Sequence, residues 1–191
     1  MVNRLAYASR SHAPATSPRA SSVATGDIAA LRRGEIVINT RSHGFTGGAV
    51  TAQMGVPLCR ADLWPLLTDY SRWTRYFPNI TRSEELPARE PGVRRLYQVG
   101  EKSFFVMAAQ VEIYLRVYEQ SQRSIRFCLE RGTFADFTAE LTLQDWHDVT
   151  LLSYSVAATP LIPVPGFVIE QGMKRDLPSN MEQMRRVLLA S

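Results

Sequence analysis

The 191-residue sequence contains few of the residues that build metal centres or disulfide scaffolds. Its two cysteines, Cys59 and Cys128, are far apart and form no CxxC pair, which argues against both kinds of structure. The three histidines, His12, His43 and His147, fall in the N-terminal segment, in a loop before the folded domain and in a predicted turn. We therefore expect no metal site and no cofactor.

Long hydrophobic runs are also absent, because no stretch approaches the roughly 18 consecutive apolar residues that a membrane-spanning helix requires. We expect a soluble protein, peripheral to a membrane at most, in the cytoplasm or in an organellar stroma or matrix. The positive charge excess is small, with 22 Lys and Arg against 18 Asp and Glu, and no nucleic-acid-binding motif accompanies it. We predict no nucleic-acid partner, and the oligomeric state stays undetermined.

The N-terminal segment, residues 1–44, differs in composition from the rest of the chain. It is rich in Ser and Ala and contains no acidic residue before Asp27. This composition is typical of a disordered tail and of an organellar transit peptide, and both alternatives stay open. Asp27 precedes the sequence IAALRR, which predicts a short helix inside the tail. Residues 45–191 are predicted to form one folded domain.

The first elements of that domain are a strand and two short helices. Residues 50–56 alternate between apolar and polar or small side chains, which predicts a strand that ends at Pro57. The sequence CRADLWPLLTDY predicts the first helix. A second helix is expected at residues 71–77 and ends before Pro78, because a proline disfavours the helical conformation of the residue before it.

A long period-two alternation dominates the second half of the chain. Apolar residues fall on one face of four segments, residues 105–117, 125–129, 137–143 and 152–158. The connections are too short for crossover helices, so these segments predict an antiparallel meander. Apolar residues then recur every three or four positions over residues 169–188, which predicts an amphipathic helix interrupted at Pro178. The predicted class is α+β: a curved antiparallel sheet wrapped around a long C-terminal helix.

Several motifs resemble the START-like superfamily, also called SRPBCC. They are VPLCRADLWPLLTDYSRWTRYFPNI, the meander, TLLSYSVAATP and DLPSNMEQMRR. Within the superfamily the chain is most similar to the polyketide cyclase/dehydrase group that includes coenzyme Q-binding START proteins. The resemblance covers roughly residues 47–190. It implies a helix-grip fold whose apolar tunnel binds lipids, quinones, steroids or polyketides, and a minority of relatives are cyclases or aromatases.

The resemblance places a ligand tunnel between the meander and the C-terminal helix. The candidate ligand-binding residues are Phe77, Tyr97, Val99, Phe105, Met107, Phe127, Phe137, Tyr154, Val156, Phe167, Ile169 and Met173. Ordinary core packing is the alternative for each of them. Tyr97 and Tyr154 could also orient a ligand through their hydroxyls. No convergent proton-exchanging or nucleophilic groups are apparent, so we assign no catalytic residue.

We predict that the domain binds or transports a hydrophobic small molecule such as a lipid, a quinone or a polyketide-like compound. One alternative is a cyclase, aromatase or dehydrase type of enzyme that uses Tyr154 or Ser153. Another is an interaction module whose cavity is filled by Phe105, Phe127 and Phe137.

Two arginines, Arg72 and Arg75, flank the aromatic residues Trp73 and Tyr76 of the second predicted helix. The simpler interpretation is a solvated helix face. Transient contact with a membrane surface is the alternative, because amphipathic aromatics and cations suit that interface.

Overall fold

One antiparallel sheet forms the body of the fold in the computed structural model, which describes residues 25–43, 47–104, 107–161 and 166–191. The strands are β1 Val37–His43, β2 Gly47–Val56, β3 Ile80–Glu90, β4 Val93–Phe104, β5 Met107–Gln120, β6 Ser124–Gly132, β7 Phe134–Trp146 and β8 Val149–Pro160. Their order in space is β1-β2-β8-β7-β6-β5-β4-β3. All neighbours except β2 and β8 are therefore consecutive along the chain.

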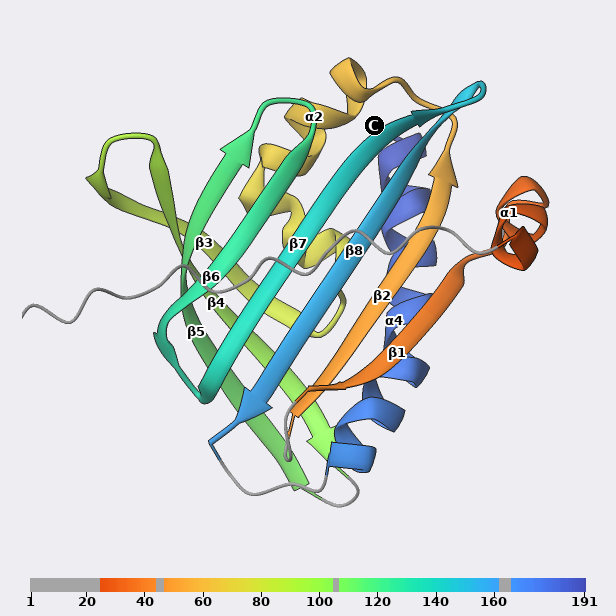
Figure 1. Cartoon of the computed structure of the whole chain (residues 1–191). Helices are drawn as coiled ribbons and strands as arrows, with labels where there is room; N and C mark the ends of the chain where they lie inside the picture. The colour runs from red at the N-terminus through yellow and green to blue at the C-terminus, as the bar shows by residue number, and fades with distance from the viewer. Residues whose placement is uncertain (1–24, 44–46, 105–106, 162–165) are drawn as a thin grey trace, which may run out of the picture.

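The helices lie around this sheet. They are α1 Thr25–Arg32, α2 Arg60–Thr68, the 3-10 helix η1 Tyr70–Arg72, α3 Trp73–Tyr76 and α4 Gly166–Leu189. The long helix α4 crosses one side of the curved sheet, where it packs against β2, β1 and α3 (Figure 1). It continues through Pro178. A curved antiparallel sheet closed by a C-terminal helix, with short helices after β2, confirms the predicted α+β helix-grip fold.

The core lies between the inner face of the sheet and α4. The meander residues that the alternation assigned to the apolar face are buried there, among them Leu115, Val117, Ile125, Leu141 and Leu152. From α4 the core receives Leu177, Met181, Met184 and Leu188, which recur at helical spacing. The period-two and helical patterns of the sequence therefore identified the two surfaces that meet.

The folded part of the chain begins earlier than the predicted boundary at residue 45. Residues 37–43, assigned to the tail from the sequence, form the edge strand β1 and pair with β2. The helix expected after Asp27 is α1, in which Leu31 packs against Val37 and Leu151. The start of β1 shows little alternation because both of its faces are covered: Val37 packs with Leu31 of α1, and the adjacent Ile38 packs against the main core.

Strands β3 and β4 were not assigned from the sequence. The structure forms them as an antiparallel pair that starts just after Asn79. Most β3 side chains are exposed, so the strand has no continuous apolar face for periodicity to detect. This pair matters because β4 supplies one wall of the cavity described below.

The outer face of the sheet contains a largely buried ion pair. Arg95 on β4 donates from Nε and Nη2 to the two carboxylate oxygens of Glu130 on β6, each at 2.9 Å. Arg95 is 7% exposed, and the Glu130 side chain is 18% exposed. The hydrogen bonds from Arg95 hold the pKa of Glu130 below its ordinary value.

We expect Glu130→Gln to lower the free energy of unfolding at neutral pH by about 1.5–3 kcal/mol, the usual contribution of hydrogen bonds to a charged group. The folded-state pKa lies below the unfolded one, so this contribution is present above the ordinary glutamate value and is lost as pH falls through the folded-state value. Urea titrations should show the deficit shrinking below about pH 4.

The control is Glu84→Gln, which breaks the exposed pair between Arg82 and Glu84. We expect that variant to lose much less stability than Glu130→Gln, because solvent screens an exposed ion pair. Equal losses in the two variants would contradict a special contribution of the buried pair.

Candidate functional site

A cavity of about 240 Å³ lies between the inner face of the sheet, α3 and α4. Its wall is mainly apolar. The aromatic residues of the wall are Trp73, Phe77, Phe134, Phe137 and Tyr154, and the aliphatic ones are Ile80, Val99, Val111, Ile113, Val156 and Leu177. A predominantly apolar hollow with a few polar groups is the usual form of a small-molecule site.

Five of the residues chosen from the sequence line this cavity: Phe77, Val99, Phe137, Tyr154 and Val156. Another candidate, Phe127, does not line it. This residue is 1% exposed, and its ring lies 4.8 Å from that of Trp73, centroid to centroid. Phe127 is therefore a core residue that supports the cavity wall from behind.

Tyr97 lies on the opposite, outer face of the sheet. Its ring packs 4.8 Å from the ring of Tyr114, and the guanidinium of Arg82 lies 5.2 Å from its centroid. The neighbouring Leu96 is fully buried on the inner face. Because successive strand residues alternate between faces, the inward position of Leu96 directs Tyr97 outward, and its assignment to the tunnel was wrong.

The remaining candidates cannot be placed against the cavity. Phe105 lies outside the described residues. Met107 belongs to β5, and Phe167, Ile169 and Met173 belong to α4, but their side chains are not among those described.

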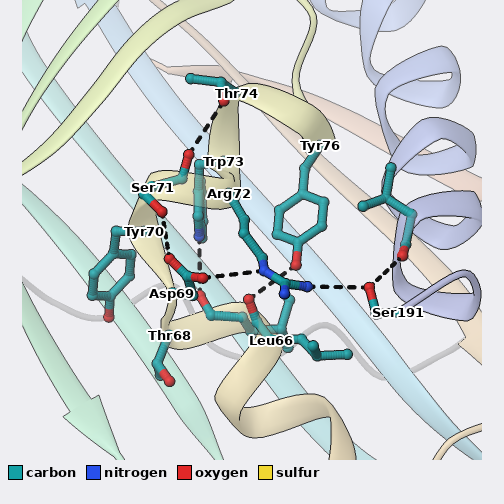
Figure 2. A network of polar contacts seen from close by, with 12 residues as sticks. Leu66, Thr68, Asp69, Tyr70, Ser71, Arg72, Trp73, Thr74, Tyr76 and Ser191 are labelled. Atoms are coloured by element: carbon teal, nitrogen blue, oxygen red, sulfur yellow. Dashed lines mark hydrogen bonds and ion pairs between the residues drawn. The ribbon is translucent and has the colours of Figure 1, made fainter.

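Hydrogen bonds from two aromatic side chains hold α3, which contributes Trp73 to the cavity wall. The Trp73 indole Nε1 donates to the Leu67 carbonyl at 3.0 Å, and the Tyr76 hydroxyl donates to the Leu66 carbonyl at 2.9 Å (Figure 2). Both acceptors are in α2, so the two bonds attach α3 to α2. The Trp73 ring can then stack on Phe77, with centroids 5.4 Å apart, and face the cavity.

Arg72 is part of the same network and is not simply solvated. Its Nε donates to Asp69 Oδ2 at 3.1 Å and its Nη1 to Ser191 Oγ at 3.2 Å, which joins the short helices to the end of α4 (Figure 2). Arg75 is exposed, as expected for a solvated face. Contact of this segment with a membrane surface stays a prediction.

The cavity also has polar lining residues that the sequence analysis did not select. These are Asn79, Gln98, Glu101, Asp176 and Asn180. Gln98 is the most enclosed of them, at 5% exposure. Gln98 lies two residues after Leu96 on β4, so the two side chains share the inner face of the sheet. Once β4 had been assigned, a polar residue at an inward position would have identified Gln98 as a candidate site residue.

Tyr154 brings a hydroxyl into the apolar wall. The residue is 7% exposed, and no described residue forms a hydrogen bond with its hydroxyl. Burial raises its pKa well above the ordinary tyrosine value, so the hydroxyl stays protonated at physiological pH and can donate a hydrogen bond. Ser153, the other polar candidate, points away, because its Oγ accepts a hydrogen bond from Gln53 at 3.1 Å.

The described residues contain no group of three or more His, Cys, Asp or Glu side chains arranged to hold a metal ion. No described helix is long and apolar enough to cross a membrane.

The fold and this cavity define a START-like protein with a hydrophobic-ligand-binding architecture. Residues 56–185 match the family described as polyketide cyclase / dehydrase and lipid transport, and the chain belongs to that family. No curated protein matches the sequence significantly.

Solved structures with the same fold have low sequence identity to this chain. A START superfamily protein from Mycobacterium smegmatis has a TM-score of 0.64 at 17% identity, with 74% of this chain and 97% of that chain covered. A STAR-related lipid transfer protein from Xanthomonas axonopodis has a TM-score of 0.62 at 16% identity, with 80% and 93% covered. The Zhui aromatase/cyclase of a Streptomyces species has a TM-score of 0.61 at 12% identity, with 74% and 93% covered.

Proposed function

We propose that this protein binds and carries a mainly apolar small molecule, such as a lipid, a quinone or a polyketide-like compound, in the cavity between the sheet and α4. The observation that carries the proposal is the apolar cavity between the sheet and α4. In a domain with only a structural role, core side chains would fill this space. A cavity of about 150 Å³ lined by apolar side chains accommodates benzene. The 240 Å³ available here therefore suits a substituted ring or a short chain.

The position of the large aromatic residues supports ligand binding over an interaction module with a filled cavity. Phe127 packs in the core behind the wall, and Phe137 lies in the wall beside Phe134, with ring centroids 5.6 Å apart. Neither residue fills the open volume. The proposal also agrees with the family description, which includes lipid transport.

A cyclase or aromatase type of enzyme is the second candidate, favoured by the unpaired Tyr154 hydroxyl in the wall. Its raised pKa makes it a poor proton donor near neutral pH, although it can stabilise a developing oxyanion by hydrogen bonding. Tyr154→Phe should abolish turnover by such an enzyme. In a carrier it should only reduce affinity, by about three- to tenfold, the usual loss from one hydrogen bond.

Native mass spectrometry of protein purified without detergent tests the carrier proposal. We expect a bound mass that disappears after organic extraction and is recovered intact in the extract. We also expect lipids or quinones from a panel to raise the melting temperature, because a ligand that binds the folded state alone stabilises it. A protein that carries no adduct and gains no stability from any member of the panel would contradict the proposal.

A further inference from the structure

A buried chain of three polar groups holds the Gln98 side chain in one orientation. Ser83 Oγ lies 2.7 Å from the Tyr70 carbonyl oxygen, to which it donates its single hydrogen. The Gln98 amide lies 3.1 Å from the same Ser83 oxygen. Since that hydroxyl hydrogen is already used, Ser83 Oγ can only accept from Gln98. The Gln98 atom that faces Ser83 is therefore the nitrogen, Nε2.

In this orientation the Gln98 carbonyl oxygen, Oε1, points away from Ser83. No described residue donates a hydrogen bond to it. In the described part of the chain, Arg116 Nε is the one unpartnered side-chain nitrogen or oxygen that is completely inaccessible. Gln98 Oε1 is not among such atoms, so it keeps some accessible surface. Because Gln98 is 95% buried and lines the cavity, we place that accessible surface at the cavity. An unpaired acceptor in such a place is costly until a donor reaches it.

A ligand carboxylate is a poor partner for Gln98 Oε1, because both groups can only accept hydrogen bonds. An anionic ligand would also lose hydration on entering this mainly apolar cavity. A carboxylate is thus disfavoured, while a neutral hydroxyl group can donate to Gln98 Oε1.

We propose that Gln98 Oε1 is a specificity-determining acceptor that makes the cavity select an uncharged, mainly apolar ligand carrying a hydroxyl donor, over its ether and over carboxylates. This inference rests on the proposed ligand-binding function and names the ligand chemistry of that site. Ser83 acts as a positioning residue, because it fixes which end of the amide faces the ligand.

Three small probes separate these chemistries: thymol, which has a hydroxyl donor; thymol methyl ether, which has the same frame without the donor; and cuminate, a carboxylate of similar size. Isothermal titration calorimetry on the full chain should give an affinity for thymol about tenfold higher than for the ether, as one hydrogen bond supplies. Cuminate should bind more weakly than either. This comparison uses the wild-type protein and depends on no variant.

Gln98→Leu should bring the affinities for thymol and its ether to within about twofold, since the acceptor is lost and the apolar wall remains. Gln53→Leu is a matched control. Gln53 is 6% exposed and donates to a serine hydroxyl at 3.1 Å, like Gln98, but it lies on the outer face of the sheet. The preference for thymol should be unchanged in that variant.

Equal affinities of the wild-type protein for thymol and its ether would overturn the inference and leave ligand binding intact. A preference that survives Gln98→Leu would overturn the role of Gln98. Stronger binding of cuminate would overturn the selection against anions. If none of the probes binds, the inference fails for this ligand class, and the native mass spectrum decides separately whether the cavity holds an apolar ligand.

Discussion

Val156→Trp is expected to lower the affinity for an uncharged hydrocarbon probe such as p-cymene by at least about 100-fold. Val156 lies in the cavity wall on β8, so the indole enters space that a ligand would occupy. Excluding about 120 Å² of apolar ligand surface at about 25 cal/mol per Å² costs about 3 kcal/mol, which is about 100-fold in affinity. Calorimetry or a ligand-induced shift in melting temperature measures the loss.

The neighbouring residue supplies the control for this prediction. Ala157 is next on β8, is absent from the cavity wall and faces the outer side of the sheet. Ala157→Trp should leave the affinity for p-cymene within about twofold, because it removes no cavity volume. Tight p-cymene binding by Val156→Trp would show that the ligand does not occupy this cavity.

Trp73→Ala is expected to lower the free energy of unfolding by about 3–5 kcal/mol, the usual cost of removing a large buried aromatic residue. Trp73 is 2% exposed and packs its ring against Phe77 and Phe127. Its indole also bonds the α2 carbonyl of Leu67, so the substitution removes both the packing and the attachment of α3. Urea unfolding followed by circular dichroism measures the change.

Trp73→Phe separates the two contributions. This variant keeps an aromatic ring near Phe77 but leaves the Leu67 carbonyl without its donor, so we expect a smaller loss of about 1–3 kcal/mol. A Trp73→Ala variant within about 1 kcal/mol of wild type would mean that the packing of α3 does not depend on this residue.

The aromatic segment around Trp73 shows where sequence reasoning succeeds. The helical spacing and Pro78 predicted a short helix at residues 71–77, and the structure has η1 followed by α3 in that place. Local rules suffice here because a proline and a few buried aromatics act within one or two turns. The same reasoning did not assign a structural role to Arg72, since its partners Asp69 and Ser191 are brought together only by the fold.

The sequence by itself determined the α+β class, the meander and the apolar faces of its strands and of α4, because residue periodicity decides which side chains share a face. The tertiary structure alone decided which inward residues meet a partner and which border open space. Phe127 and Phe137 have the same alternation, yet one is core and the other is cavity wall. The orientation of Gln98 likewise depends on Ser83 and Tyr70, 15 and 28 positions away in the chain. Periodicity cannot predict which inward side chains become core and which become cavity wall, since this depends on how the curved sheet and α4 pack against each other.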